Sequence, residues 1–91
     1  MPRLRVTAHL RTHVGENPIE TTGATVREVL ESTFVMSPTL RGYVLDDQGQ
    51  VRHHVAIFVN GQTIADRLRL SDPVPPDGEV FVMQALSGGT L

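Results

Sequence analysis

Val55-Ala56-Ile57-Phe58-Val59-Asn60-Gly61 is the stretch that decides the fold of this chain. Its first five residues are mainly β-branched or aromatic, which is typical of a strand buried inside a sheet. Asn60-Gly61 is typical of a tight hairpin turn, and Gln62-Thr63-Ile64 follows as a short returning strand. We therefore expect a central strand at 55–59 and a hairpin that ends near residue 64.

Two strands are predicted before this hairpin. Arg3 to Arg11 alternates between polar and apolar residues, which is the period of a half-buried strand. The apolar members of the alternation are Leu4, Val6, Ala8 and Leu10. Ile19 to Thr22 is a short β-prone run that follows turn-forming residues at 14–18, so the first two strands should form a hairpin.

The last strand is predicted at 79–85, after the turn Pro75-Pro76-Asp77-Gly78. Alternation places Val80 and Val82 on one face of this strand, and Phe81 and Met83 on the other. Between residues 65 and 74, Leu68 and Leu70 are the expected apolar anchors. Tyr43 to Leu45 and Val51-Arg52 flank a polar turn and suggest one more small hairpin.

The main helix is predicted from Val26 to Phe34. Thr25 stands at the N-cap and Glu28 follows three residues later, which is the spacing of a capping box. The apolar face comprises Val26, Val29, Leu30 and Phe34. Pro38 either ends the helix or begins a short second helical turn containing Leu40.

This order of elements predicts an α+β fold in which one main helix covers a mixed sheet of four to five strands. The length of 91 residues fits a single domain, which we place at 1–86. Residues 87–91 contain two consecutive glycines and should form a flexible C-terminal tail.

The composition excludes several classes of function. A net charge of −2 argues against a general nucleic-acid binder, and we expect no metal, bound cofactor or membrane span. The N-terminus lacks the apolar core of a signal peptide, so we expect a cytoplasmic protein. The absence of cysteine removes thiol nucleophiles, and His9, His13, His53 and His54 lack the partners that a metal site needs.

The chain contains no lysine, and all eight of its basic residues are arginine. The sequence therefore offers no side-chain amine that could accept an isopeptide bond. A GC-rich coding sequence is the simpler explanation, and we favour it over selection against lysine.

Several short motifs occur in an order and spacing that resemble the ThiS/MoaD family, the ubiquitin-like β-grasp sulfur carriers. The motifs are Val59-Asn60-Gly61, Asp66, Leu68, Pro76-Asp77-Gly78-Glu79-Val80 and Ser87-Gly88-Gly89. The resemblance covers nearly the whole chain and implies a β-grasp fold. It also implies that the chain is a protein substrate and carrier, not an enzyme.

The family chemistry implied by this resemblance takes place at the glycine pair. An adenylating enzyme uses ATP to activate the carboxylate of Gly89, and sulfur then converts it to a thiocarboxylate that serves a sulfur-accepting synthase. Gly88 and Gly89 lack a Cβ atom, so they can thread a narrow channel in the partner. This chain departs from the family pattern because Thr90-Leu91 follow the glycines. Some family members that this chain resembles also carry extra residues after the glycines, and a JAMM-type zinc metalloprotease removes them. The resemblance therefore implies that Thr90-Leu91 are removed in the same way.

The resemblance also implies that partner enzymes grip the sheet face and the strand before the tail. The expected interface comprises Phe58, Phe81, Met83, Leu86 and Ser87, with Leu86 as its best anchor. Phe58 lies in the most apolar run, so the core competes for it, and we favour a core position.

Two other functions remain open. The chain could be a ubiquitin-like modifier that is joined to target lysines through Gly89, or a β-grasp binding module that is never activated. The recipient pathway is also open, although the residues after Gly89 favour a processed carrier in an amino-acid or secondary-metabolite pathway.

Overall fold

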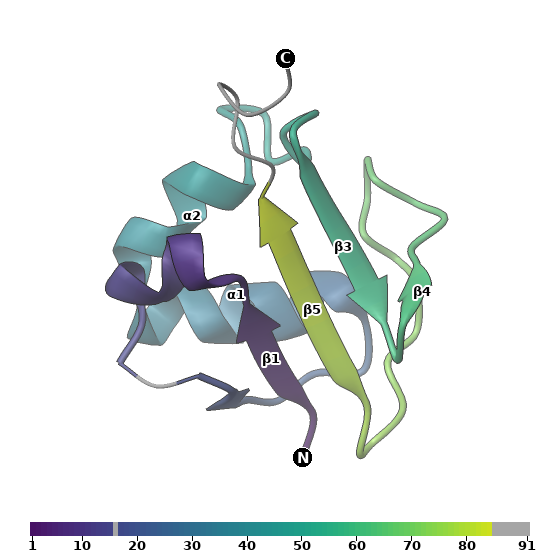
Figure 1. The fold of residues 1–91 in the computed structure, drawn as a ribbon. Helices are drawn as coiled ribbons and strands as arrows, with labels where there is room; N and C mark the ends of the chain where they lie inside the picture. Colours follow the sequence, from purple (N-terminus) through teal and green to yellow (C-terminus); the bar gives the residue numbers. More distant parts are fainter. Residues whose placement is uncertain (16, 85–91) are drawn as a thin grey trace.

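A computed structural model describes residues 1–15 and 17–84 of the chain. Five strands form one sheet in the order β2-β1-β5-β3-β4, and the helices lie against one of its faces (Figure 1). The strands are β1 (Arg3–Val6), β2 (Ile19–Glu20), β3 (Val55–Val59), β4 (Gln62–Thr63) and β5 (Glu79–Gln84). The helices are the 3-10 helix η1 (Ala8–His13), α1 (Val26–Met36) and α2 (Pro38–Val44). The predicted α+β fold with a mixed sheet is confirmed.

Strand β5 occupies the middle of the sheet. It runs parallel to β1, from Arg3 beside Glu79 to Val6 beside Val82, and antiparallel to β3. The prediction of β3 as the central strand is therefore only half right, because β3 lies inside the sheet but one position from its middle. Two of the predicted antiparallel pairs are confirmed, since β1 pairs with β2 and β3 with β4.

Helix α1 begins as its sequence predicts. The hydroxyl of Thr25 accepts a hydrogen bond from the backbone of Glu28, and the Glu28 carboxylate accepts one from the backbone of Ala24 at 2.8 Å. These bonds satisfy backbone donors that the first turn of a helix leaves free. The helix runs two residues beyond the predicted end at Phe34, and Ser37 separates it from α2.

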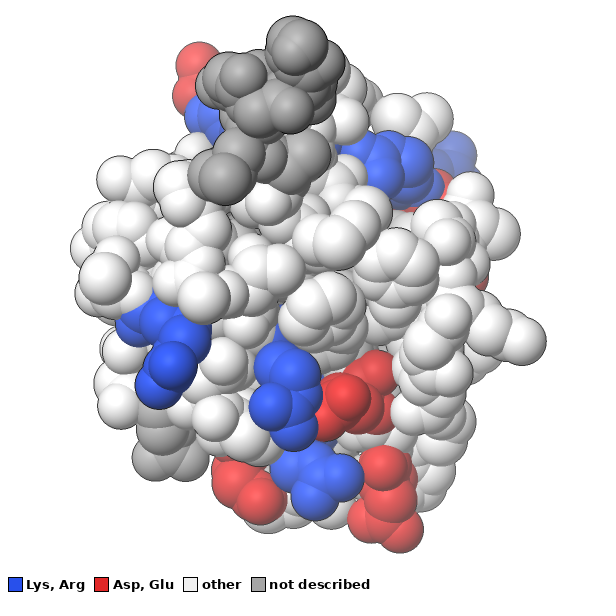
Figure 2. All heavy atoms as spheres, in the orientation of Figure 1, with Lys and Arg blue, Asp and Glu red and all other residues white. Residues whose placement is uncertain are grey.

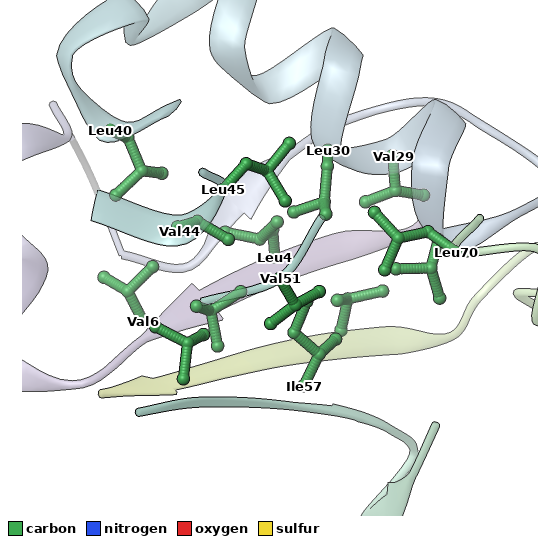
Figure 3. Packing of buried hydrophobic residues seen from close by; sticks show 14 of the residues in the cluster. Leu4, Val6, Val29, Leu30, Leu40, Val44, Leu45, Val51, Ile57 and Leu70 are labelled. Atoms are coloured by element: carbon green, nitrogen blue, oxygen red, sulfur yellow. The ribbon is translucent and has the colours of Figure 1, made fainter. Parts of the chain in front are cut away.

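The core lies between the sheet and the two α-helices (Figure 3). Leu4 and Val6 from β1, Val29 and Leu30 from α1, and Ile57 from β3 point into this layer. Each of these five side chains has at most 2% of its surface exposed. Burying a side chain of this size stabilises the fold by about 1.5–3 kcal/mol, so the layer holds the sheet and helices together.

The predicted first strand is wrong beyond Val6. The backbone amide of Leu10 donates to the carbonyl of Thr7 at 2.8 Å, so the chain turns into η1. Ala8 is consequently exposed, whereas Leu10 is fully buried at the end of that turn. The alternating pattern failed because a tight turn can also deliver a single leucine to the core.

The predicted strand at Tyr43 to Leu45 is also wrong. Tyr43 and Val44 belong to α2, which starts at Pro38 and buries Leu40, as the second alternative for Pro38 predicted. Of the suggested hairpin, one bridge between Leu45 and Val51 remains around the 46–50 turn.

The loop between β4 and β5 is braced by Asp66. Its carboxylate accepts hydrogen bonds from the backbone amides of Leu68, Arg69 and Ser71 and from the hydroxyl of Ser71. These bonds, above all that from the Arg69 amide, lower the pKa of Asp66 to about 2. Leu70 is fully buried as an anchor, but Leu68 is 62% exposed, so the prediction of two anchors is half wrong.

Replacing Thr25 with alanine should lower the free energy of unfolding by about 1 kcal/mol, because the N-cap acceptor is lost. Urea denaturation followed by circular dichroism would measure the change. Thr12→Ala is the matched control, since Thr12 is exposed in η1. Equal stabilities of the two variants would show that the cap contributes nothing.

Asp66 should also make stability depend on pH. Its pKa lies below the ordinary value of 3.8, so its stabilising contribution is present above pH 3.8 and disappears as the pH falls through about 2. Asp66→Asn should therefore be less stable than the wild type near neutral pH, and the difference should shrink in strong acid. Denaturation curves across this range provide the measurement, and a difference independent of pH would contradict it.

Candidate functional site

The outer face of the sheet, which the helices leave uncovered, carries the candidate site. Along β5, Val80 and Val82 are fully buried, whereas Phe81 is half-buried and Met83 is 38% exposed. The predicted division of β5 into a core face and an outer face is confirmed. Phe81 and Met83 are therefore available to a partner.

Phe58 joins these residues from the neighbouring strand. It is half-buried on the outer face and opposite Phe81 in the ladder, with the two ring centroids 6.2 Å apart. The preference for a core position is therefore wrong, because in β3 the core takes Val55 and Ile57. A strand that is apolar on both faces does not reveal which face is buried.

These side chains form the outer apolar patch, which we define as Phe58, Phe81 and Met83. Together with Gly61 and Glu79 they line a shallow hollow of about 340 Å³. The sequence reasoning missed Gly61 and Glu79 as parts of this surface. The two-residue spacing from Glu79 to Phe81 and Met83 was the available signal, since it places all three on one face.

Charged residues border the patch at the beginning of β5. The guanidinium of Arg5 lies 3.2 Å from the Glu79 carboxylate, and Arg3 is beside Glu79 in the parallel ladder. Figure 2 shows this sheet face with most of its charged side chains in the lower part, a few at the upper edge and an uncharged region between them. The patch thus has an apolar centre and a charged border, as protein interfaces often have.

The tight turn after β3 holds the beginning of β5. Asn60 and Gly61 both adopt positive φ angles, 51° and 85°, as a type I′ hairpin turn requires. The Asn60 amide donates to the Glu79 carbonyl, and the Glu79 amide donates to the Asn60 side-chain oxygen, each at 2.9 Å. The Asn-Gly motif therefore fixes the hairpin and also positions the strand that leads to the tail.

The other end of β5 is the root of the tail. Gln84 is opposite Val55, and its side-chain nitrogen lies 3.2 Å from Nε2 of His54. Leu86, Ser87, Gly88, Gly89, Thr90 and Leu91 lie outside the described residues. Their proposed roles, and the boundary at residue 86, therefore stay predictions.

Within residues 1–15 and 17–84, no three histidine or acidic side chains gather as metal ligands would. His53 and His54 have ring centroids 5.7 Å apart in an edge-on arrangement. None of the helices among these residues has the length and hydrophobicity that spanning a bilayer requires.

Comparison with known structures shows the same architecture. The crystal structure of the Amycolatopsis orientalis BexX/CysO complex contains a chain with a TM-score of 0.86 and 21% identity, covering 98% of this chain and 100% of that one. SAMP1 from Haloferax volcanii has a TM-score of 0.79 and 24% identity, covering 97% and 98%. CysO from Mycobacterium tuberculosis has a TM-score of 0.82 and 18% identity, covering 94% and 100%.

Comparison with curated protein sequences gives no match. The family model of the ThiS family, however, matches residues 4–89, which includes every strand and helix described above except Arg3, the first residue of β1. The fold is the ubiquitin-like β-grasp, and the chain belongs to the ThiS family.

Proposed function

We propose that this chain is a sulfur carrier protein that works in the cytoplasm. In this proposal an activating enzyme adenylates the carboxylate of Gly89 with ATP, and sulfur replaces AMP to give a thiocarboxylate. The thiocarboxylate then donates sulfur to a synthase in a biosynthetic pathway. The observation that carries the proposal is the family match, which extends through the glycine pair and ends at Gly89.

The arrangement of β5 supports this role physically. Pairing with β1 holds the strand as far as Val82 and pairing with β3 holds it as far as Gln84, so the tail follows a residue that is still part of the sheet. The reactive group belongs to the main chain, and the described surface needs no catalytic side chains. We therefore assign the chemistry to partner enzymes and treat this chain as their substrate.

The outer apolar patch supports docking on a partner. Phe58, Phe81 and Met83 lie on the strands next to the root of the tail, and an exposed apolar cluster of this kind marks interaction sites. In our proposal Leu86 and Ser87 continue this surface into the tail. One structural neighbour was solved as a BexX/CysO complex, so a protein of this fold has been crystallised with a partner.

Thr90-Leu91 must be removed before activation in this account. With these residues present, the carbonyl carbon of Gly89 is held in a peptide bond to Thr90, so Gly89 has no carboxylate to adenylate. We propose a JAMM-type metalloprotease for this step. The family match ends just before these two residues, which is consistent with a removable extension.

A protein modifier is the second candidate. SAMP1 from Haloferax volcanii, the neighbour compared above, is by its name a small archaeal modifier protein. In this alternative the activated Gly89 carboxylate forms an amide with a lysine of a target protein. Both candidates share adenylation, so they differ in the acceptor of the acyl group.

A chain that ends at Gly89 should be activated without the protease, whereas the chain that ends at Leu91 should not. ATP–pyrophosphate exchange measures adenylation directly, with an activating enzyme from the same organism. Gly89→Leu in the shortened chain is the matched control, because it restores a bulky terminus at the same length. Equal exchange by the full-length and shortened chains would contradict the proposed processing, and no exchange by either chain would contradict the carrier role.

A further inference from the structure

The distribution of arginine has a chemical consequence for an activated terminus. Five of the arginines bond to other groups of the domain, and Arg27 does so from two nitrogens of its guanidinium, which an ammonium group cannot reproduce well. Arg27, Arg52 and Arg67 donate to backbone carbonyls, and Arg5 and Arg41 contact Glu79 and Glu31. Arg3, Arg11 and Arg69 are exposed, and lysine would be tolerated there. All eight of these basic side chains are nevertheless guanidinium groups.

We propose that this all-arginine set of basic side chains keeps the domain inert toward its own activated C-terminal acyl group. This inference rests on the proposed function, in which Gly89 carries an adenylate or another activated acyl group. Whether codon bias or selection produced the arginines does not alter the consequence. The acyl group is then preserved for a nucleophile supplied from outside the domain, such as sulfide or the amine of another protein.

The chemistry of capture explains why amines matter. A neutral amine attacks the acyl carbon, a C–N bond forms, the bond from that carbon to the AMP oxygen or the thioester sulfur breaks, and the amine proton goes to solvent. Lysine has an ordinary pKa of about 10.4 and supplies a small neutral fraction in mildly alkaline solution. The delocalised guanidinium of arginine has no free electron pair on a neutral nitrogen, so it does not attack.

An amine near the root of the tail would be close enough to attack the activated acyl group. His53 is exposed and precedes β3, whose first residue, Val55, pairs with Gln84 at the root of the tail. Residues 85–89 can extend up to about 17 Å from the root, so the acyl carbon of Gly89 can reach an amine at position 53.

The far end of the sheet is protected by distance. The start of β5 lies about 17 Å from Gln84 along the strand, so the tail covers that distance only when it is fully stretched backwards. Asp77 lies beyond that point, and the α-amine of Met1 is 3.6 Å from its carboxylate. Both are therefore at the end of the sheet that the acyl group reaches least.

The test needs neither the activating enzyme nor sulfur. The chain is made with an intein in place of Thr90-Leu91 and cleaved with mercaptoethanesulfonate, which leaves a thioester at Gly89. His53→Lys introduces an amine near the root, and His53→Arg is its matched control with equal charge. Asp77→Lys places the same amine at the far end of the sheet. Circular dichroism first confirms that all the proteins fold alike.

Intact mass spectrometry follows the thioester in mildly alkaline buffer. The internal amide has the mass of the hydrolysed acid minus one water. His53→Lys should form it at least about tenfold faster than the wild type, His53→Arg or Asp77→Lys, because the short tail gives the amine a high effective concentration.

Rapid formation of that product by the wild type would overturn the inference, as would a His53→Lys variant that reacts no faster than Asp77→Lys. Neither result would affect the carrier proposal, since the thioester is made without adenylation. Conversely, failure of the exchange assay would leave this chemical result standing.

Discussion

The pairing of β5 on both of its edges is the constraint on which the rest of the structure depends. The parallel ladder to β1 and the antiparallel ladder to β3 fix the strand in the middle of the sheet. Asn60 bonds to both the backbone amide and the backbone carbonyl of Glu79, the first residue of the strand. Because side chains alternate, one face of β5 is then committed to the core through Val80 and Val82. The other face is left to Phe81 and Met83, and the strand ends where the tail begins.

This division explains how so small a domain can have both a buried core and an apolar surface that is open to a partner. The core is supplied by one sheet face and the two α-helices, so the fold does not need the outer face for its cohesion. Apolar side chains on that outer face can therefore serve a partner at little cost in stability. Arg5 and Glu79 pair beside the patch. Their charges can orient a partner, which the apolar contact alone does not do.

Local patterns in the sequence predicted the parts of the fold that local interactions determine. Thr25 with Glu28 located the start of α1, and alternation sorted the two faces of β5, because each signal acts within a few residues. The prediction failed where tertiary packing decides the outcome. Leu10 reaches the core through the turn of η1 and not along a strand, and Phe58 faces outward because the core takes Val55 and Ile57. The patch residues were predicted, but their joining into one hollow with Gly61 required the register between β3 and β5.

The central claim is that the outer face of β5 serves a partner while its inner face serves the fold, and Met83→Asp tests it most directly. Calorimetric titration of the Gly89-ending chain with its activating enzyme, beside urea denaturation, separates the two roles. Val35→Asp is the matched control, because Val35 is 80% exposed on α1, away from the outer face of the sheet. The account predicts at least about tenfold weaker binding for Met83→Asp, with the free energy of unfolding within about 1 kcal/mol of the wild type. Unchanged binding, or a loss of stability as large as a core substitution causes, would contradict it.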